Sequence, residues 1–201
     1  MKVIVICGAS GSGKTSSVKN LATKFACPYL LFDEYLDADT YPQDIKQWFL
    51  EGGDLAQITT PRLVSALTAF TKQNEYPFIF VEEPFGRCRT AIAPLVDEVV
   101  LLDMPLEICL SRVIMRNINN SPSKSHIMIA NYLARYDDHL RAIYREMVER
   151  ARQSSDLIVQ DLGSVEHLAE LICEWLTNHY GCKAIWTDWA NAKCSSRLGL
   201  L

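Results

Sequence analysis

The sequence has no pair of cysteines at CxxC spacing, and its seven cysteines, an odd number, are scattered along the 201 residues. A scattered, odd set is typical of reduced thiols in a cytosolic protein. It argues against a disulfide framework and against a cysteine zinc site. The four histidines are also dispersed, so we expect each to be a core or surface residue and not a metal ligand.

Long apolar runs and an excess of positive charge are also missing. No apolar run is long enough to cross a bilayer, and the apolar start at 3–7 is too short for a signal peptide because it leads directly into a glycine loop. We therefore expect a cytoplasmic protein with no membrane partner. The formal net charge is -4. A mildly acidic chain is not a general nucleic-acid binder, so any anion site must come from local cations.

Five short apolar runs alternate with segments of helical periodicity. Runs of this kind are typical of parallel strands that are buried on both faces. Strands are predicted at Lys2–Cys7, Tyr29–Phe32, Pro77–Val81, Glu98–Leu102 and Leu157–Gln160. Helices are predicted near 12–26, 42–51, 61–74, 105–117, 126–154 and 165–176. The alternation predicts a three-layer α/β/α fold, with a five-stranded, mainly parallel sheet.

The length suits one domain with a sizeable core. We expect this domain to span 1–180, with a short lid at about 112–126, and a tail at 181–201 that has no clear period. The tail contains Trp186 and Trp189, which would either pack over the domain or contact a partner. A partner contact of this kind would allow a homodimer.

The segment from Gly8 to Thr15 reads GASGSGKT and matches the pattern GxxxxGK[ST]. It follows a predicted buried strand and opens a predicted helix, which is the context that supports a phosphate-binding loop. Its backbone N–H groups and the helix dipole would face the phosphates, and Lys14 would reach the β- and γ-phosphates. The residues predicted to bind the nucleotide are Gly8, Ala9, Ser10, Gly11, Ser12, Gly13, Lys14, Thr15 and Ser16.

A triphosphate implies Mg²⁺, which needs few protein ligands. The hydroxyl of Thr15 is the expected ligand from the loop. Glu82 and Glu83 end the third predicted strand, whose carboxyl end should face the site. Glu82 is therefore our second candidate for a metal contact, through water.

Two motifs that mark other P-loop classes are absent. The chain has no NKxD motif, which a guanine-specific switch would use to read the base, and no LSGGQ-like signature of a transporter ATPase. It is also too short for a helicase core with a second lobe. A small kinase is the class that these absences favour.

The order of several segments resembles the uridine kinase and nicotinamide riboside kinase group of P-loop kinases, over about residues 2–175. After the phosphate loop, FDEYLDADTYP at 32–42 resembles the acidic segment of that group, and RVIMRNINNSPSKS at 112–125 resembles its lid. The stretch 131–159 resembles its long helix and last strand. The resemblance implies an enzyme that uses ATP and Mg²⁺ to transfer the γ-phosphoryl group to a hydroxyl of a nucleoside-like small molecule.

The same resemblance implies roles for particular residues. Asp33 occupies the position of the general base, and the adjacent Glu34 is its competitor. Lys14 and Arg116 would stabilise the transferred phosphoryl group, and Arg112, four residues earlier on the same helix face, would bind the nucleotide. Lys124 is a weaker lid candidate.

Further residues are expected in the acceptor pocket. Glu83 with Arg87 resembles an acid-then-arginine arrangement of deoxynucleoside kinases, in which either Arg87 or Arg89 would approach the acceptor. Tyr35, beside the base, and Arg62 are expected to bind the acceptor as well. Two further aromatic residues of this region are Tyr41 and Trp48, and packing of a helix is the favoured account of Trp48.

Three other functions fit the same sequence. A nucleoside monophosphate kinase would use convergent arginines, and Arg62, Arg87 and Arg89 would supply them. An enzyme related to zeta-type toxins would phosphorylate an amino sugar nucleotide or an antibiotic. A regulator that binds ATP without turnover is the alternative from another class. The sequence does not distinguish ATP from GTP as the donor.

Overall fold

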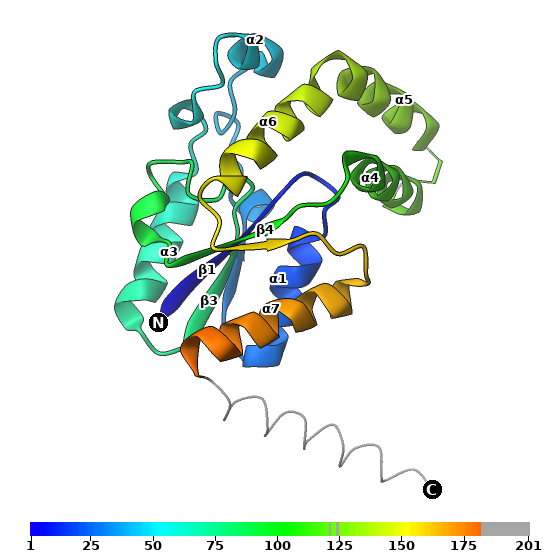
Figure 1. The fold of residues 1–201 in the computed structure, drawn as a ribbon. Coiled ribbons are helices and arrows are strands. Elements are labelled where there is room, and N and C mark those ends of the chain that lie inside the picture. Colours follow the sequence, from blue (N-terminus) through cyan, green and yellow to red (C-terminus); the bar gives the residue numbers. More distant parts are fainter. Residues whose placement is uncertain (121, 124, 182–201) are drawn as a thin grey trace, which may run out of the picture.

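The run Lys2–Cys7 forms β1, the central strand of a five-stranded sheet in which every pairing is parallel. The computed structural model describes residues 1–120, 122–123 and 125–181. The strand order is β2-β3-β1-β4-β5, as Figure 1 shows for the middle of the domain. The other strands are β2 (Tyr29–Leu31), β3 (Phe78–Glu82), β4 (Glu98–Leu102) and β5 (Leu157–Val159).

Alternate residues of β1 supply two separate cores. Val3, Val5 and Cys7 pack into the apolar cluster on one face of the sheet, and Ile4 and Ile6 pack into the cluster on the other face. A strand with both faces covered has no position for a polar side chain, which explains its uninterrupted apolar run.

Helices cover both faces of the sheet. One face is covered by α1 (Lys14–Phe25) and α7 (Val165–Tyr180), which pack against each other, and the opposite face by α3 (Pro61–Gln73) and α6 (Arg141–Arg152). The predicted three-layer α/β/α architecture is therefore confirmed. The remaining helices are α2 (Ile45–Leu50), α4 (Leu106–Asn120) and α5 (Ser125–Arg135).

The helix predicted at 126–154 is not a single regular α-helix. A π-helical turn, Tyr136–Leu140, separates α5 from α6. The wider turn keeps both Tyr136 and Leu140 buried, whereas Leu133 in α5 is 39% exposed. The predicted apolar stripe therefore reaches the core only from Tyr136 onward. Turns of this kind often occur at functional sites.

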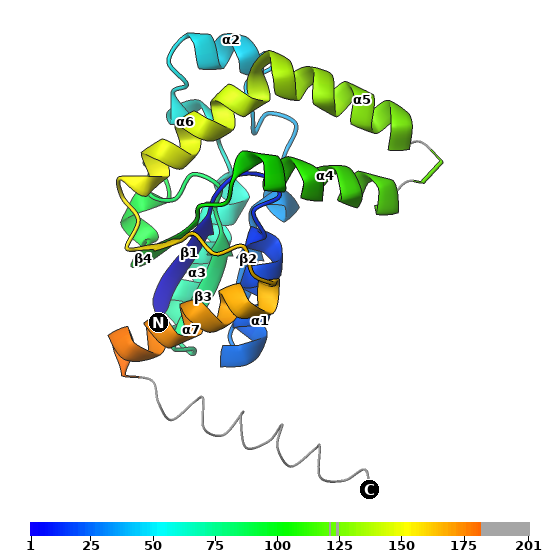
Figure 2. The same cartoon turned by 45° about the vertical axis from the view of Figure 1, so that its right-hand side comes forward.

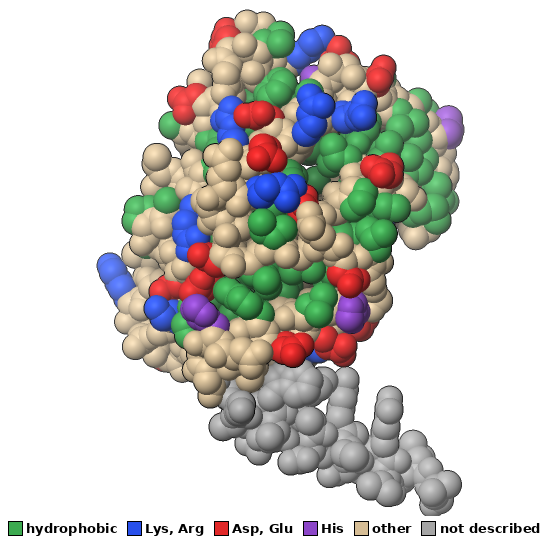
Figure 3. Space-filling view, viewed as in Figure 1, with side chains coloured by type: hydrophobic (Ala, Val, Ile, Leu, Met, Phe, Trp, Pro, Cys, Tyr) green, Lys and Arg blue, Asp and Glu red, His purple; other side chains and the backbone are tan. Residues whose placement is uncertain are grey.

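Helices α4 and α5 run side by side and extend away from the sheet (Figure 2). The predicted lid at 112–126 lies in the second half of α4 and the start of α5. Figure 3 shows apolar side chains gathered over this pair of helices. The exposed apolar residues here are Met115, Ile118, Ile127, Met128 and Leu133.

Two expectations concern the remaining parts of the chain. Within the ranges that the structure describes, no helix is both long enough and apolar enough to span a bilayer. Trp186, Trp189 and Lys124 lie outside the described residues, and so does the predicted tail beyond Gly181.

Candidate active site

The phosphate loop curls between β1 and α1 at the carboxyl end of the central strand. Gly8 has φ +138°, and a Cβ atom there would lie 2.6 Å from the carbonyl oxygen of Leu102. Gly11, which the motif does not require, has φ +89°, and its Cβ would lie 2.2 Å from the carbonyl oxygen of Cys109. Both positions need glycine because of backbone conformation and close approach. The loop is therefore fixed between β1, β4 and α4.

Lys14 and Glu82 are buried together under this loop. The Lys14 ammonium donates to the carbonyl oxygen of Ala9 at 2.9 Å and lies 4.0 Å from the Glu82 carboxylate. Burial lowers the pKa of Lys14, which the Glu82 and Asp33 carboxylates oppose. Burial likewise raises the pKa of Glu82, which Lys14 and a hydrogen bond from Thr15 oppose. Each charge is held in place by its opposite, at the point where a triphosphate would add further negative charge.

The hydroxyl of Thr15 donates to the Glu82 carboxylate at 2.8 Å. A hydroxyl from the loop and a carboxylate from the end of β3 thus form a pair of hard oxygen atoms, the ligand type that Mg²⁺ prefers. This donor set fits magnesium, and the metal prediction for Thr15 and Glu82 is compatible with it. Glu83 does not share the site because its carboxylate is bound to Arg89.

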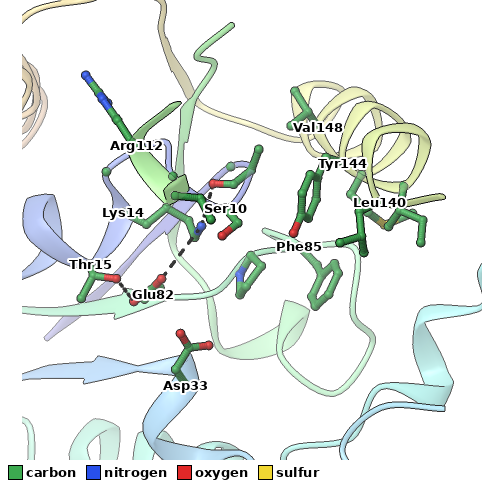
Figure 4. A pocket seen from close by; sticks show the side chains of 18 of the residues that line it. Ser10, Lys14, Thr15, Asp33, Glu82, Phe85, Arg112, Leu140, Tyr144 and Val148 are labelled. Atoms are coloured by element: carbon green, nitrogen blue, oxygen red, sulfur yellow. Dashed lines mark hydrogen bonds and ion pairs between the residues drawn. The ribbon is translucent and has the colours of Figure 1, made fainter. Parts of the chain in front are cut away.

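Asp33 lies across the same cavity from the phosphate loop, directly after β2, in a short 3₁₀ turn, Phe32–Tyr35. Figure 4 shows its carboxylate on the side of the cavity opposite Lys14, pointing toward Glu82. Asp33 is exposed to solvent, so an acceptor hydroxyl could reach it. Glu34 does not line the cavity. The geometry therefore favours Asp33 over its neighbour as the base.

The two predicted lid arginines, Arg112 and Arg116, both line the cavity from α4. The Arg112 guanidinium donates to the carbonyl oxygen of Ser12 at 3.4 Å, so it lies against the phosphate loop. Arg116 is one turn further along the helix and is exposed. Ser12 itself is fully buried and does not line the cavity, and its backbone N–H donates to the carbonyl oxygen of Ala9 at 3.1 Å. The other eight predicted loop residues, Gly8, Ala9, Ser10, Gly11, Gly13, Lys14, Thr15 and Ser16, line the cavity.

The cavity has a volume of about 920 Å³, and its two ends differ in chemistry. The phosphate loop, Glu82 and the arginines of α4 form a polar end. Figure 4 shows Phe85, Leu140, Tyr144 and Val148 gathered on the other side, away from Thr15 and Glu82. We name this region the apolar lobe, and its members are Tyr41, Pro42, Ile45, Trp48, Ile58, Phe85, Leu140, Ile143, Tyr144, Met147 and Val148.

Two of the predicted acceptor residues, Glu83 and Arg87, do not line the cavity. The Arg87 guanidinium donates to Asp156 at 2.7 Å and to the carbonyl oxygen of Ser154 at 2.8 Å, so it joins the loop after β3 to the start of β5. Glu83 is fully buried beside Arg89, which also donates to the Thr60 hydroxyl at 2.9 Å. Glu83, Arg87 and Arg89 therefore hold segments of the domain together. The structure does not place them where they could contact an acceptor in the cavity.

Arg62 and Tyr35 do not line the cavity either. Arg62 is paired with Asp37 at 3.2 Å, and its guanidinium lies 5.8 Å from the centre of the Tyr35 ring. Tyr41, from the same acidic segment, does line the cavity. Burial, together with the Asp33 and Glu83 carboxylates, raises the pKa of Tyr41, so its phenol keeps its proton. The aromatic residue beside Asp33 in the cavity is thus Tyr41 and not Tyr35.

Most of the apolar lobe was not identified from the sequence. Trp48 was assigned to packing, and it does pack: it is buried, and its indole N–H donates to the carbonyl oxygen of Asp54 at 2.9 Å. The same residue also lines the cavity. Ile143 and Met147 lay on the predicted core stripe, and apolar residues at helical spacing do not show whether they face a core or a cavity. Arg135, Ser164 and Val165 also line the cavity and had no motif to mark them.

Solved structures with a similar fold include two shikimate kinases. The one from Acinetobacter baumannii, solved in complex with shikimate, is 19% identical, with a TM-score of 0.50, covering 89% of this chain and 94% of its own. The one from Aquifex aeolicus is 17% identical, with a TM-score of 0.52 and coverage of 90% and 99%. The protein TT1252 from Thermus thermophilus is 18% identical, with a TM-score of 0.53 and coverage of 88% and 97%.

No family model matches the chain, and no curated protein matches it. The similarity to solved structures is below the identity at which function can be carried over, so it establishes the fold alone. Fold and site together define a P-loop protein of the three-layer α/β/α type, whose loop Gly8–Thr15 opens into one cavity with Asp33 on the opposite wall.

Proposed function

We propose that this protein is an ATP-dependent kinase that transfers the γ-phosphoryl group to a hydroxyl of a small molecule. The observation that carries the proposal is the position of Asp33, which shares one cavity with Lys14, Thr15 and Glu82 and lies opposite them. A carboxylate at this place would not bind the phosphates directly, because like charges repel. It is well placed to accept the proton of an attacking hydroxyl.

In the proposed step, the acceptor oxygen forms a bond to Pγ while the bond between Pγ and the β,γ-bridging oxygen breaks. The products are a phosphate monoester and ADP, and Asp33 receives the hydroxyl proton. Lys14 and Arg116 would stabilise the negative charge that is spread over the transferred group. Arg112 would hold the nucleotide from the lid side of the loop.

Mg²⁺ is the metal that the Thr15 and Glu82 oxygens would hold. When bound, it would neutralise charge on the β- and γ-phosphates. Few protein ligands are needed because phosphate and water oxygens complete the coordination of Mg²⁺ in sites of this kind.

The similarity in fold to shikimate kinases supports a small hydroxyl compound as the acceptor class. The resemblance in sequence to uridine kinases supports the narrower proposal of a nucleoside-like acceptor in the cytoplasm. A nucleoside monophosphate kinase is less well supported, because Arg62, Arg87 and Arg89 are engaged elsewhere and do not converge on an acceptor phosphate. A regulator that binds ATP without turnover would need no carboxylate opposite the phosphate loop, where Asp33 lies.

The test is an ADP-release assay with Mg²⁺ and ATP, across nucleosides, nucleotides, sugars and other small alcohols. We expect at least one hydroxyl compound to raise ADP release well above the rate with water alone. Asp33→Asn should remove that increase and still bind ATP. ATP binding with no acceptor-dependent ADP release from any compound would favour the regulator and contradict the proposal.

A further inference from the structure

The apolar lobe contains almost no group that could neutralise an acidic acceptor. Of the described residues that line the whole cavity, the lysine and arginine side chains are Lys14, Arg112, Arg116 and Arg135. Lys14 is committed to Ala9 and Glu82, and Arg112 to the phosphate loop. Arg116 and Arg135 belong to the lid helices α4 and α5 and are both exposed. The eleven residues of the apolar lobe include no cation.

The negative charges of the cavity also disfavour an anionic acceptor. Asp33 and Glu82 both face it, and the bound triphosphate would add more negative charge at the polar end. A carboxylate or phosphate placed in the apolar lobe would lie against apolar side chains, and the unpaired arginines of the described lining, Arg116 and Arg135, belong to α4 and α5 outside the lobe. A buried charge is tolerated only when it is paired, so this arrangement discriminates against anionic acceptors.

Hydrogen-bonding groups are also scarce in the lobe. The indole N–H of Trp48 is used by Asp54, and the Tyr144 hydroxyl lies 3.4 Å from the Tyr132 hydroxyl. Besides these two groups, the polar side chains on this side of the cavity are those of Tyr41 and Gln43. The rest of the wall consists of aromatic rings and branched hydrocarbon, which bind apolar surface and leave polar groups unpaired.

We infer that the acceptor is an uncharged alcohol with an apolar ring or branched hydrocarbon body, which occupies the apolar lobe and presents one hydroxyl to Asp33. This inference rests on the proposed kinase function and departs from a nucleoside-like acceptor, because the lobe offers few partners for a polar base and sugar hydroxyls. Acids such as shikimate and acceptors that carry a phosphate are excluded from that class. Compact polyols are excluded as well, because their hydroxyls would lose water without gaining partners.

The experiment compares acceptors that differ in one property. Shikimate and methyl shikimate differ in charge, as do 4-(hydroxymethyl)cyclohexanecarboxylate and its methyl ester, while cyclohexylmethanol and glycerol differ in the polarity of the carbon body. Acceptor-dependent ADP release is measured for each with Mg²⁺ and ATP, and binding is measured in parallel by saturation-transfer NMR. We expect the uncharged member of each charged pair, and cyclohexylmethanol over glycerol, to have the higher kcat/KM, by about tenfold or more.

Two matched variants test the cause. Gln43 lines the cavity and is exposed, so Gln43→Arg would add a cation at the edge of the lobe without burying it. Gln47, four residues later and within α2, is exposed and does not line the cavity. Gln43→Arg should improve shikimate relative to methyl shikimate by about fivefold or more, and Gln47→Arg should not change the ratio.

Each result has a definite meaning. If the wild-type protein prefers the anionic member of each pair, the inference is overturned, and loss of that preference in Arg135→Ala would identify the cation responsible. Equal kcat/KM for both members would overturn it too. If uncharged compounds bind selectively but none raises ADP release, the kinase function fails while the assigned chemistry of the lobe stands.

Discussion

The hydroxyl of Thr15 donates to the carboxylate of Glu82 at 2.8 Å, which joins the phosphate loop to the end of β3. This hydrogen bond brings together the two oxygen atoms that we expect Mg²⁺ to use. The same two groups would therefore join the loop to the strand and bind the metal. Variants of either residue should separate these two roles.

Thr15→Val should remove the magnesium-dependent part of nucleotide binding. The hydroxyl would be lost while the shape of the side chain is kept, and we expect activity to fall by about 100-fold, as for the loss of one polar contact to the reacting phosphates. Thr15→Ser is the matched control, because it keeps the hydroxyl. The measurement is the rise in unfolding temperature with ATP, with and without Mg²⁺. Equal rises in both variants would argue against a metal role for Thr15.

Asp33→Asn should lower phosphoryl transfer by about 10²- to 10⁴-fold, because an amide cannot accept the hydroxyl proton. ATP affinity should be unchanged or slightly higher, since a negative charge has been removed from the cavity. Glu34→Gln is the control, since Glu34 is adjacent and does not line the cavity. Steady-state kinetics and ATP titration give both quantities. A larger loss in Glu34→Gln would assign the base to Glu34 instead.

The pH dependence of stability should report the burial of Glu82. Its pKa is raised in the folded protein, chiefly by burial, so its contribution to stability is present below about pH 4.5 and is lost as the pH rises through the raised value. Glu82→Gln cannot ionise and should lack this loss. Denaturant unfolding of both proteins, measured upward from about pH 4.5, is the test, and parallel profiles would mean that the pKa of Glu82 is not raised in the folded protein.

Arg89 and Glu83 form a fully buried pair that fixes the loop after β3 against the segment at 58–60. Arg89→Leu would leave the Glu83 carboxylate buried without its partner, so we expect a loss of about 3–5 kcal/mol in the free energy of unfolding. Lys46→Ala breaks the exposed pair with Asp138 and should leave the unfolding midpoint almost unchanged. Urea denaturation compares the two. A midpoint for Arg89→Leu close to that of Lys46→Ala would contradict a structural role for the pair.

The fold and the polar end of the cavity could be predicted from the sequence because local signals specify them. The covered part of a strand must be apolar, as Val3 to Cys7 of β1 are, and a loop that folds around phosphate needs glycine where Gly8 lies. Acids at strand ends were found for the same reason, since the carboxyl ends of parallel strands meet at one edge. Asp33 and Glu82 both lie in the cavity as a result.

The acceptor side could not be predicted in the same way. An exposed arginine binds whichever acid the fold brings near, and the partner of Arg87 is Asp156, 69 residues away along the chain. Apolar residues that line a cavity are the same types as those that fill a core, so Ile143 and Met147 gave no signal of their position. The π-helical turn at Tyr136–Leu140, which changes the helix that carries them, follows from packing and not from a local motif.

The central claim is phosphoryl transfer from ATP to a hydroxyl, and ³¹P NMR of the reaction mixture tests it most directly. The protein is incubated with Mg²⁺, ATP and the acceptor that gives the highest ADP release, and Asp33→Asn is run beside it. The account predicts equal amounts of ADP and a new phosphate monoester with the wild-type protein and neither with the variant. ADP accompanied only by inorganic phosphate, or a monoester formed equally well by Asp33→Asn, would contradict it.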